Sequence, residues 1–125
     1  MSTTDTPAAQ TATPIEFMHG AFSAQVEGHI GTADQKLSYS VVAEEGQFMI
    51  VNVIGRTPMM ATDGVVVFPN GQQTGGPGGV VMNQALPASG TYIITAGQHL
   101  MATNVPEGDL VVEVIVLPSY LLNQQ

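Results

Sequence analysis

Apolar and polar residues alternate along much of this chain, and this two-residue period predicts β-strands. From Phe22 to Ile30 every second residue is apolar or small, and the residues between them are Ser, Gln, Glu and His. The same alternation returns over residues 36–43, after a turn at 31–34. Alternation of this kind is typical of strands that bury one face and expose the other.

Four further apolar stretches predict strands without clear alternation. They are residues 48–54, 65–68, 80–86 and 110–117. The first of them, FMIVNVI, is almost wholly apolar, so we expect a central strand that is covered on both faces. Between them we expect an exposed glycine-rich loop at 71–79, GQQTGGPGG, and an irregular excursion at 97–109.

The stretch LPASGTY at residues 86–92 predicts a tight corner between two strands. Pro87 cannot donate to a sheet ladder, and Ser89-Gly90 is typical of a turn. Tyr92 then opens a strand that runs to Ala96, with its aromatic ring predicted to lie on the inner face.

About eight strands and no convincing helix predict an all-β fold. We expect a single β-sandwich or jelly-roll-like domain of about eight antiparallel strands over residues 15–118. A tail follows at 119–125, and an extended arm, MSTTDTPAAQTATP, precedes the domain at 1–14. Ordering an arm of small and polar residues costs conformational entropy, and contacts must offset that cost. We therefore expect the arm to be held by contacts with its own domain or with a neighbouring molecule.

Charge narrows the possible partners. The 125 residues include ten carboxylates and two basic residues, Lys36 and Arg56, which gives a net charge of −8. Nucleic acid is excluded as a partner because phosphate binding needs clustered Lys and Arg, and an anionic membrane surface is disfavoured for the same reason. No apolar run approaches the roughly 20 residues of a membrane span. The acidic field favours a basic protein partner.

Candidate catalytic and metal-binding residues are sparse. The absence of cysteine excludes disulfides and thiolate metal sites. Three histidines, His19, His29 and His99, could act as a base, but none is accompanied by a G-x-S-x-G nucleophile motif. His29 falls on the polar face of its strand, so His99 is the most plausible functional histidine. We expect no enzyme and no cofactor.

Scattered carboxylates offer two weaker possibilities. Glu44-Glu45 could act as an acid–base pair, although adjacent turn residues are usually solvated. The second possibility is a surface calcium site formed by turn carboxylates, namely Asp34, Asp63, Glu107 and Asp109. They lack the spacing of a calcium loop, so we expect them simply to form turns.

The order of several motifs resembles the bacterial prepeptidase C-terminal β-sandwich domains and the similar periplasmic inhibitors of g-type lysozyme. The motifs are GHIG at 28–31, EGQ at 45–47, VFPNG at 67–71 and LPASGTY at 86–92, and the resemblance covers about residues 15–117. It implies that Ser89, Gly90 and Tyr92 match an S-G-x-Y element of the inhibitors. It also implies basic residues in the region matching 96–109, where this chain has no Arg or Lys.

Two hypotheses of function follow. The first is a non-catalytic structural protein, a β-sandwich subunit of a homo-oligomer or larger assembly such as a virion or phage capsid decoration, held through its arm. The second is a secreted or periplasmic binding module such as a g-type lysozyme inhibitor. Both make Ser89, Gly90, Tyr92 and His99 candidate residues for binding a protein partner.

The N-terminal sequence MSTTD lacks the basic and apolar regions of a signal peptide. We therefore expect the virion surface if Met1 is the native start. If a signal peptide has been removed, we expect the periplasm or the extracellular space.

Overall fold

The computed structural model describes residues 12–99 and 105–122, which form nine strands and one helical turn. The strands are β1 (Thr13–Pro14), β2 (Ser23–Ile30), β3 (Lys36–Ala43), β4 (Phe48–Gly55), β5 (Thr62–Val67), β6 (Gln73–Pro77), β7 (Gly79–Ala85), β8 (Gly90–Gln98) and β9 (Gly108–Leu117). The helical turn is α2 (Ser119–Leu122), in a tail that was not expected to form an element. The predicted all-β sandwich is confirmed.

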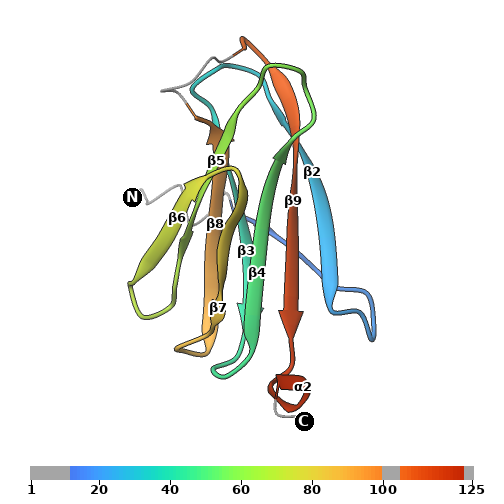
Figure 1. Cartoon of the computed structure of the whole chain (residues 1–125), viewed down its shortest axis with the longest axis vertical. Helices are drawn as coiled ribbons and strands as arrows, with labels where there is room; N and C mark the ends of the chain where they lie inside the picture. The colour runs from blue at the N-terminus through green and yellow to red at the C-terminus, as the bar shows by residue number, and fades with distance from the viewer. Residues whose placement is uncertain (1–11, 100–104, 123–125) are drawn as a thin grey trace, which may run out of the picture.

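Two sheets stack face to face (Figure 1). One has the order β1-β3-β8-β5-β6 and the other the order β2-β9-β4-β7. Successive strands from β2 onward alternate between the sheets, except for the β5–β6 hairpin. All pairings are antiparallel except β1 with β3, which is parallel and joins Thr13 to Tyr39 and Pro14 to Ser40. β1 lies in the predicted arm, and the strands within residues 15–118 all pair antiparallel, as predicted.

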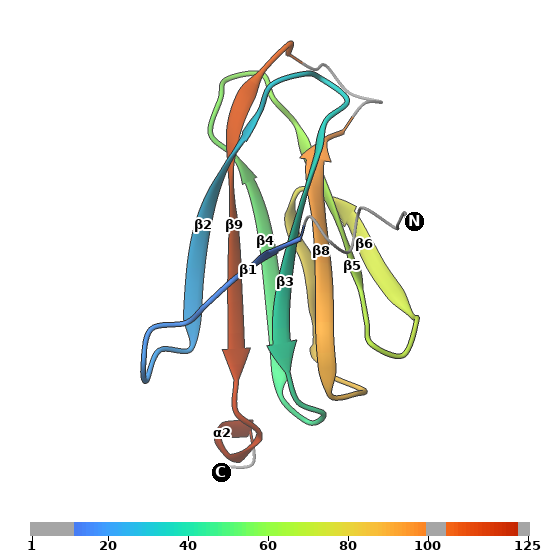
Figure 2. The ribbon, with the colours of Figure 1, turned by 180° about the vertical axis from the view of Figure 1, so that it is seen from behind.

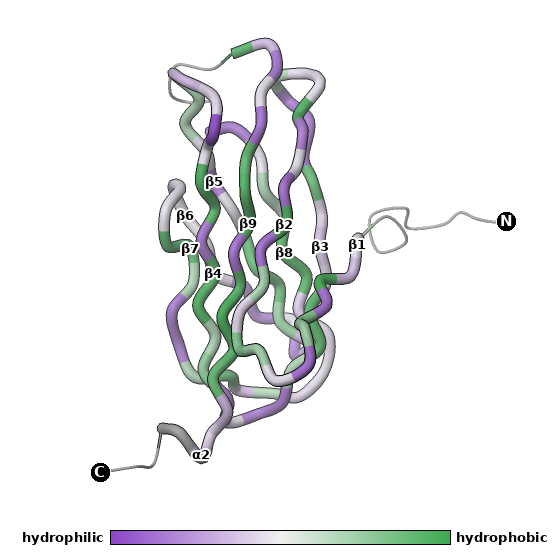
Figure 3. The backbone as a smooth tube through the Cα atoms, turned by 90° about the vertical axis from the view of Figure 1, so that its right-hand side faces the viewer, coloured by the Kyte–Doolittle hydropathy of each residue, from purple (hydrophilic) through white to green (hydrophobic). Residues whose placement is uncertain are grey.

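The core lies between the sheets and is built from alternate residues of the central strands. The inner residues are Tyr39, Val41 and Ala43 of β3, Met49, Val51 and Val53 of β4, Tyr92, Ile94 and Ala96 of β8, and Leu110, Val112 and Val114 of β9. Burial of each large side chain contributes about 1.5–3 kcal/mol. In Figure 3 the green colour of hydrophobic residues follows the middle of β4 and β9.

Strand β4 is central, but the prediction that both of its faces are covered was wrong. Its inner residues are buried, whereas Phe48 and Ile50 on the outer face are half-buried and Ile54 is 43% exposed. Also on this outer face, the Asn52 side-chain amide donates to Glu113 of β9 over 2.8 Å. The strand is apolar on both sides, but only the opposite sheet covers it.

The glycine-rich segment is a strand rather than a loop. Residues 73–77 form β6, an edge strand paired with β5. A Cβ atom on Gly75 would lie 2.9 Å from the Cα of Val65, so only glycine allows the two backbones to approach this closely. At the hairpin turn Gly71 has φ +90° and donates to the Phe68 carbonyl over 3.0 Å.

The excursion expected at 97–109 is shorter than predicted, because β8 continues to Gln98 and β9 starts at Gly108. Gln98 is fully buried. Its side-chain amide donates to the Val105 carbonyl over 2.6 Å and accepts from the Val105 amide over 2.8 Å. The Gln98 side chain thus satisfies both backbone hydrogen-bonding groups of Val105, as a neighbouring strand would.

The chain between β1 and β2, residues 15–22, crosses from one sheet to the other, and we call it the crossing segment (Figure 2). At one end Ile15 is buried and its amide donates to Ser40 of β3 over 2.8 Å. At the other end Phe22 accepts from the Val116 amide of β9 over 2.8 Å. The crossing segment thus closes one side of the sandwich.

Residues 1–11 of the predicted arm lie outside the described residues, so what holds them stays a prediction. In the part that is described, no helix has the length and apolar character needed to cross a membrane.

Candidate functional site

The corner at residues 86–90 is hydrogen-bonded to the turn between β3 and β4. The Leu86 amide donates to the Gln47 carbonyl over 2.7 Å, and the Gly46 amide donates to the Leu86 carbonyl over 3.0 Å. The Ser89 Oγ accepts from the Glu45 amide over 2.8 Å. Two turns that are 40 residues apart in sequence thereby form one rigid end of the sandwich, which we call the corner end.

Tyr92 anchors the corner from inside. Its ring is fully buried and packs against Phe68 with the ring centroids 5.3 Å apart. Its hydroxyl donates to the Ala88 carbonyl over 2.6 Å. Burial raises the pKa of this hydroxyl, and the Glu45 charge adds to that effect. The predicted inward aromatic is confirmed, and its side chain offers no surface to a partner.

Gly90 occupies a position where both the backbone conformation and the space beside it favour glycine. Its φ is +144°, and a Cβ atom would lie 2.9 Å from the Cβ of Pro69. Of the S-G-x-Y element, Ser89 and Thr91 present exposed side chains, and the Ser89 hydroxyl oxygen already accepts a hydrogen bond from the Glu45 amide. Partner binding by Ser89, Gly90 and Tyr92 stays a prediction. Because Tyr92 is buried, it could contribute to binding only by fixing the conformation of the corner.

His99 lies at the opposite end of the sandwich. It follows β8, whose nine residues span roughly 30 Å from the corner. Its ring Nδ1 lies 3.6 Å from Asp63 Oδ2, and its amide donates to Ala61. In residues 12–99 and 105–122 no Ser or Thr hydroxyl is hydrogen-bonded to a histidine ring. The structure therefore does not bring His99 together with Ser89, Gly90 and Tyr92.

The predicted exposure of His29 is confirmed, but the sequence did not show its two carboxylate partners. Its Nδ1 lies 2.7 Å from Asp109 and its Nε2 lies 3.4 Å from Glu107. The hydrogen bond to Asp109 and the charges of both carboxylates raise the pKa of His29. The pairing depends on the β2–β9 register, in which His29 lies opposite Asp109. Within the described ranges no group of three or more His, Asp or Glu side chains could hold a metal ion.

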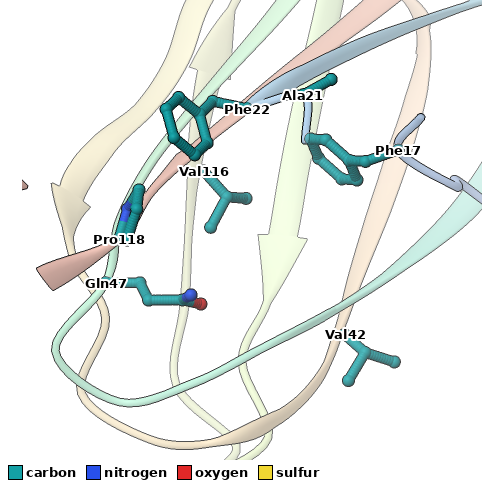
Figure 4. A pocket seen from close by; sticks show the side chains of 7 residues that line it. All are labelled: Phe17, Ala21, Phe22, Val42, Gln47, Val116 and Pro118. Atoms are coloured by element: carbon teal, nitrogen blue, oxygen red, sulfur yellow. The ribbon is translucent and has the colours of Figure 1, made fainter. Parts of the chain in front are cut away.

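A groove of about 210 Å³ opens beside the corner end, between the crossing segment and the ends of β3 and β9. It is lined by Phe17, Ala21, Phe22, Val42, Gln47, Val116 and Pro118. Figure 4 shows the two phenylalanines on one rim, Gln47 and Val42 on the other, and Val116 between them. Sequence reasoning missed this groove because its lining comes from four separate segments.

Most of the lining side chains are apolar, and the groove is open to solvent. Val42 is 78% exposed and Phe22 is 41% exposed. Exposed apolar side chains that gather around a concave surface mark a binding site more often than isolated ones do. Pro118 of the lining directly precedes α2, in which Tyr120 is 62% exposed.

The corner end is acidic. Glu44 and Glu45 are exposed in the β3–β4 turn, and Glu16 is exposed beside Phe17. The two basic residues of the chain lie at the other end, Lys36 at the start of β3 and Arg56 directly after β4. Lys36 Nζ contacts the Gln98 carbonyl at 3.2 Å and Asp63 at 3.5 Å. No fixed positive charge therefore compensates the carboxylates around the groove.

Comparison with known proteins supports a binding module. No family model and no curated protein matches the chain. Among solved structures, a periplasmic inhibitor of g-type lysozyme from Aeromonas hydrophila is 28% identical with a TM-score of 0.66, and the match covers 85% of this chain and 96% of that one. The inhibitor from Salmonella Typhimurium is 19% identical, also with a TM-score of 0.66, over 85% and 97% of the two chains.

A pre-peptidase C-terminal domain of a Bacillus anthracis collagenase has a TM-score of 0.52 at 15% identity, over 84% of this chain and 93% of that one. The chain thus has the β-sandwich fold of these domains, and the predicted resemblance is confirmed. The lysozyme inhibitors among these neighbours support a protein-interaction module. The absence of enzyme activity stays a prediction. The comparisons give no support to the hypothesis of a capsid decoration protein.

Proposed function

We propose that this protein binds and inhibits a g-type lysozyme. The observation that carries the proposal is its likeness to the inhibitor from Aeromonas hydrophila, at 28% identity over nearly the whole of both chains. Fold likeness alone would not indicate a partner, because one fold serves many functions. Here the S-G-x-Y corner of the inhibitors is also present at Ser89, Gly90 and Tyr92, in a rigid turn.

The geometry of the corner end suits insertion into a concave enzyme site. Ser89, Glu44 and Glu45 stand on two turns that are tied together by three hydrogen bonds, so little conformational entropy would be lost on binding. The resemblance implied basic contact residues near 96–109. In this chain the charged groups at the corner are carboxylates, so the interaction surface that we propose on the lysozyme is basic.

Titration of a purified g-type lysozyme acting on peptidoglycan tests the proposal. We expect hydrolysis to fall in proportion to the added protein until an equimolar ratio is reached. Glu45→Lys should weaken inhibition at least tenfold, because it reverses an exposed charge at the corner without removing the backbone bond to Ser89. No inhibition at a hundredfold molar excess would overturn the proposal.

Glu27→Lys is the matched control. It makes the same charge change on an exposed position in the middle of β2, outside the corner end. We expect it to inhibit nearly as well as the unchanged protein. If Glu27→Lys and Glu45→Lys were equally impaired, only net charge would matter and the corner would not be the binding site.

A further inference from the structure

We propose that the groove beside the corner end is a docking site for a protein segment that presents one apolar side chain flanked by Lys or Arg. This proposal does not depend on lysozyme inhibition, because it concerns the side of the sandwich that the crossing segment closes. It rests on the size of the groove, its exposed apolar lining and the charges around it.

The size of the groove favours a side chain over a small molecule. Its volume of about 210 Å³ lies below the roughly 300–1,000 Å³ that is usual for small-molecule pockets. It is a shallow depression on the surface rather than an enclosed cavity. A single aromatic or branched aliphatic side chain of a partner would cover Val42 and Phe22.

The lining offers one polar group to orient such a segment. The Gln47 carbonyl accepts from Leu86, and its side-chain oxygen accepts from the Glu44 amide over 2.8 Å. The Gln47 side-chain nitrogen has no hydrogen-bond partner among the described residues. It can therefore donate to a backbone carbonyl of the docked segment, as polar groups at the edge of apolar pockets commonly do.

Charge identifies the occupant. The Glu44 amide donates to Gln47 of the lining, and Glu44 and Glu45 are both exposed, so two carboxylates stand in the turn at one rim of the groove. Lys36 and Arg56, the two basic residues of the whole chain, lie at the opposite end. A segment with Lys or Arg next to its apolar anchor would meet complementary charge, and an acidic segment would be repelled. A second copy of this acidic chain would be repelled as well.

A synthetic peptide with one central Phe between two Lys pairs tests the proposal, with a counterpart in which every Lys is replaced by Glu. Binding is followed by NMR shifts of the valine methyl groups on titration. We expect the Lys peptide to shift the methyl groups of Val42 and Val116 at least threefold more than those of Val80, which lies on the other edge of the sandwich. The Glu peptide should leave all three unchanged.

Val42→Asp should reduce the affinity for the Lys peptide at least tenfold. The position is 78% exposed, so the variant is expected to fold, and Val80→Asp at a 58% exposed position is its control. Equal binding by both variants, or equal binding of both peptides, would overturn the proposal. Shifts of Val42 and Val116 that depend on protein concentration alone would place a second copy in the groove and would also overturn it.

Discussion

At the scale of single residues, Tyr92 links the core to the corner. Its ring fills space against Phe68, and its hydroxyl fixes the Ala88 carbonyl four residues upstream. A tyrosine that bonds back to the backbone at the end of a strand is a known stabilising device of β-sandwiches. The ring and the hydroxyl can be separated by mutation.

We expect Tyr92→Phe to lower the free energy of unfolding by about 1 kcal/mol, because it removes one hydrogen bond and keeps the ring. Tyr92→Ala should cost about 3–5 kcal/mol, because it also empties a fully buried site. Urea unfolding followed by circular dichroism measures both values. Tyr120→Phe, at a 62% exposed position, should change the stability by less than about 0.5 kcal/mol. Equal effects of Tyr92→Phe and Tyr120→Phe would contradict the role of the hydroxyl.

Gly90 gives a second prediction at this scale. We expect Gly90→Ala to destabilise the fold by about 1–3 kcal/mol, because φ is +144° and the new methyl group would press on Pro69. Gly76→Ala is the control, since a Cβ atom there meets nothing within 4 Å and its φ is not positive. Chemical denaturation compares the two variants. The interpretation fails if Gly76→Ala proves the more damaging substitution.

The corner was predictable because turn preferences are local properties of the sequence. Pro87, Gly90 and the inward Tyr92 can be recognised from their neighbours alone. The bond from the Glu45 amide to Ser89 joins residues 44 positions apart, and it depends on how β3 and β8 pair. No local pattern encodes that pairing, so the candidate site could be predicted as a motif but not as a surface.

At the scale of elements, the strands with alternating or continuous apolar residues were predictable, and the glycine-rich strand β6 was not. Residues 23–30 and 36–43 alternate, and they form β2 and β3. β6 has the sequence QTGGP, which lacks side chains to show a period, and it pairs because Gly75 allows close backbone contact. The groove was not predictable for a related reason, since Phe22 and Val42 meet only after the crossing segment has joined the sheets.

His29 connects two elements, the end of β2 and the start of β9, in a manner that depends on pH. Because Asp109 and Glu107 raise its pKa in the folded state, the protonated ring stabilises the fold. That contribution is fully present below the ordinary pKa of 6.5 and is lost as the pH rises through the higher folded-state pKa. We expect the stability difference between the unchanged protein and His29→Gln to be larger at about pH 5.5 than at about pH 8.5.

Thermal unfolding at several pH values measures this difference. Asp109→Asn should flatten the same pH dependence, because it removes the principal partner of His29. If His29→Gln retained the full pH dependence of the unchanged protein over this range, the contacts of His29 with Asp109 and Glu107 would not be the source of that pH dependence.

At the scale of the whole molecule, charge is distributed unevenly. A net charge of −8 surrounds a domain whose two basic residues both lie away from the corner end. The negative field near Glu44 and Glu45 should therefore accelerate the approach of a cationic segment to the groove, and salt should screen that field.

We expect the association rate of the Lys peptide to fall on the order of tenfold between about 50 mM and 500 mM NaCl, while its dissociation rate changes little. Glu44→Gln combined with Glu45→Gln should flatten this salt dependence, since it removes the nearest charges without changing the shape of the side chains. Glu27→Gln combined with Glu107→Gln removes the same net charge elsewhere and should leave most of the slope. Stopped-flow fluorescence resolves the two rates. Identical slopes for the two double variants would mean that net charge, and not its position at the corner end, directs association.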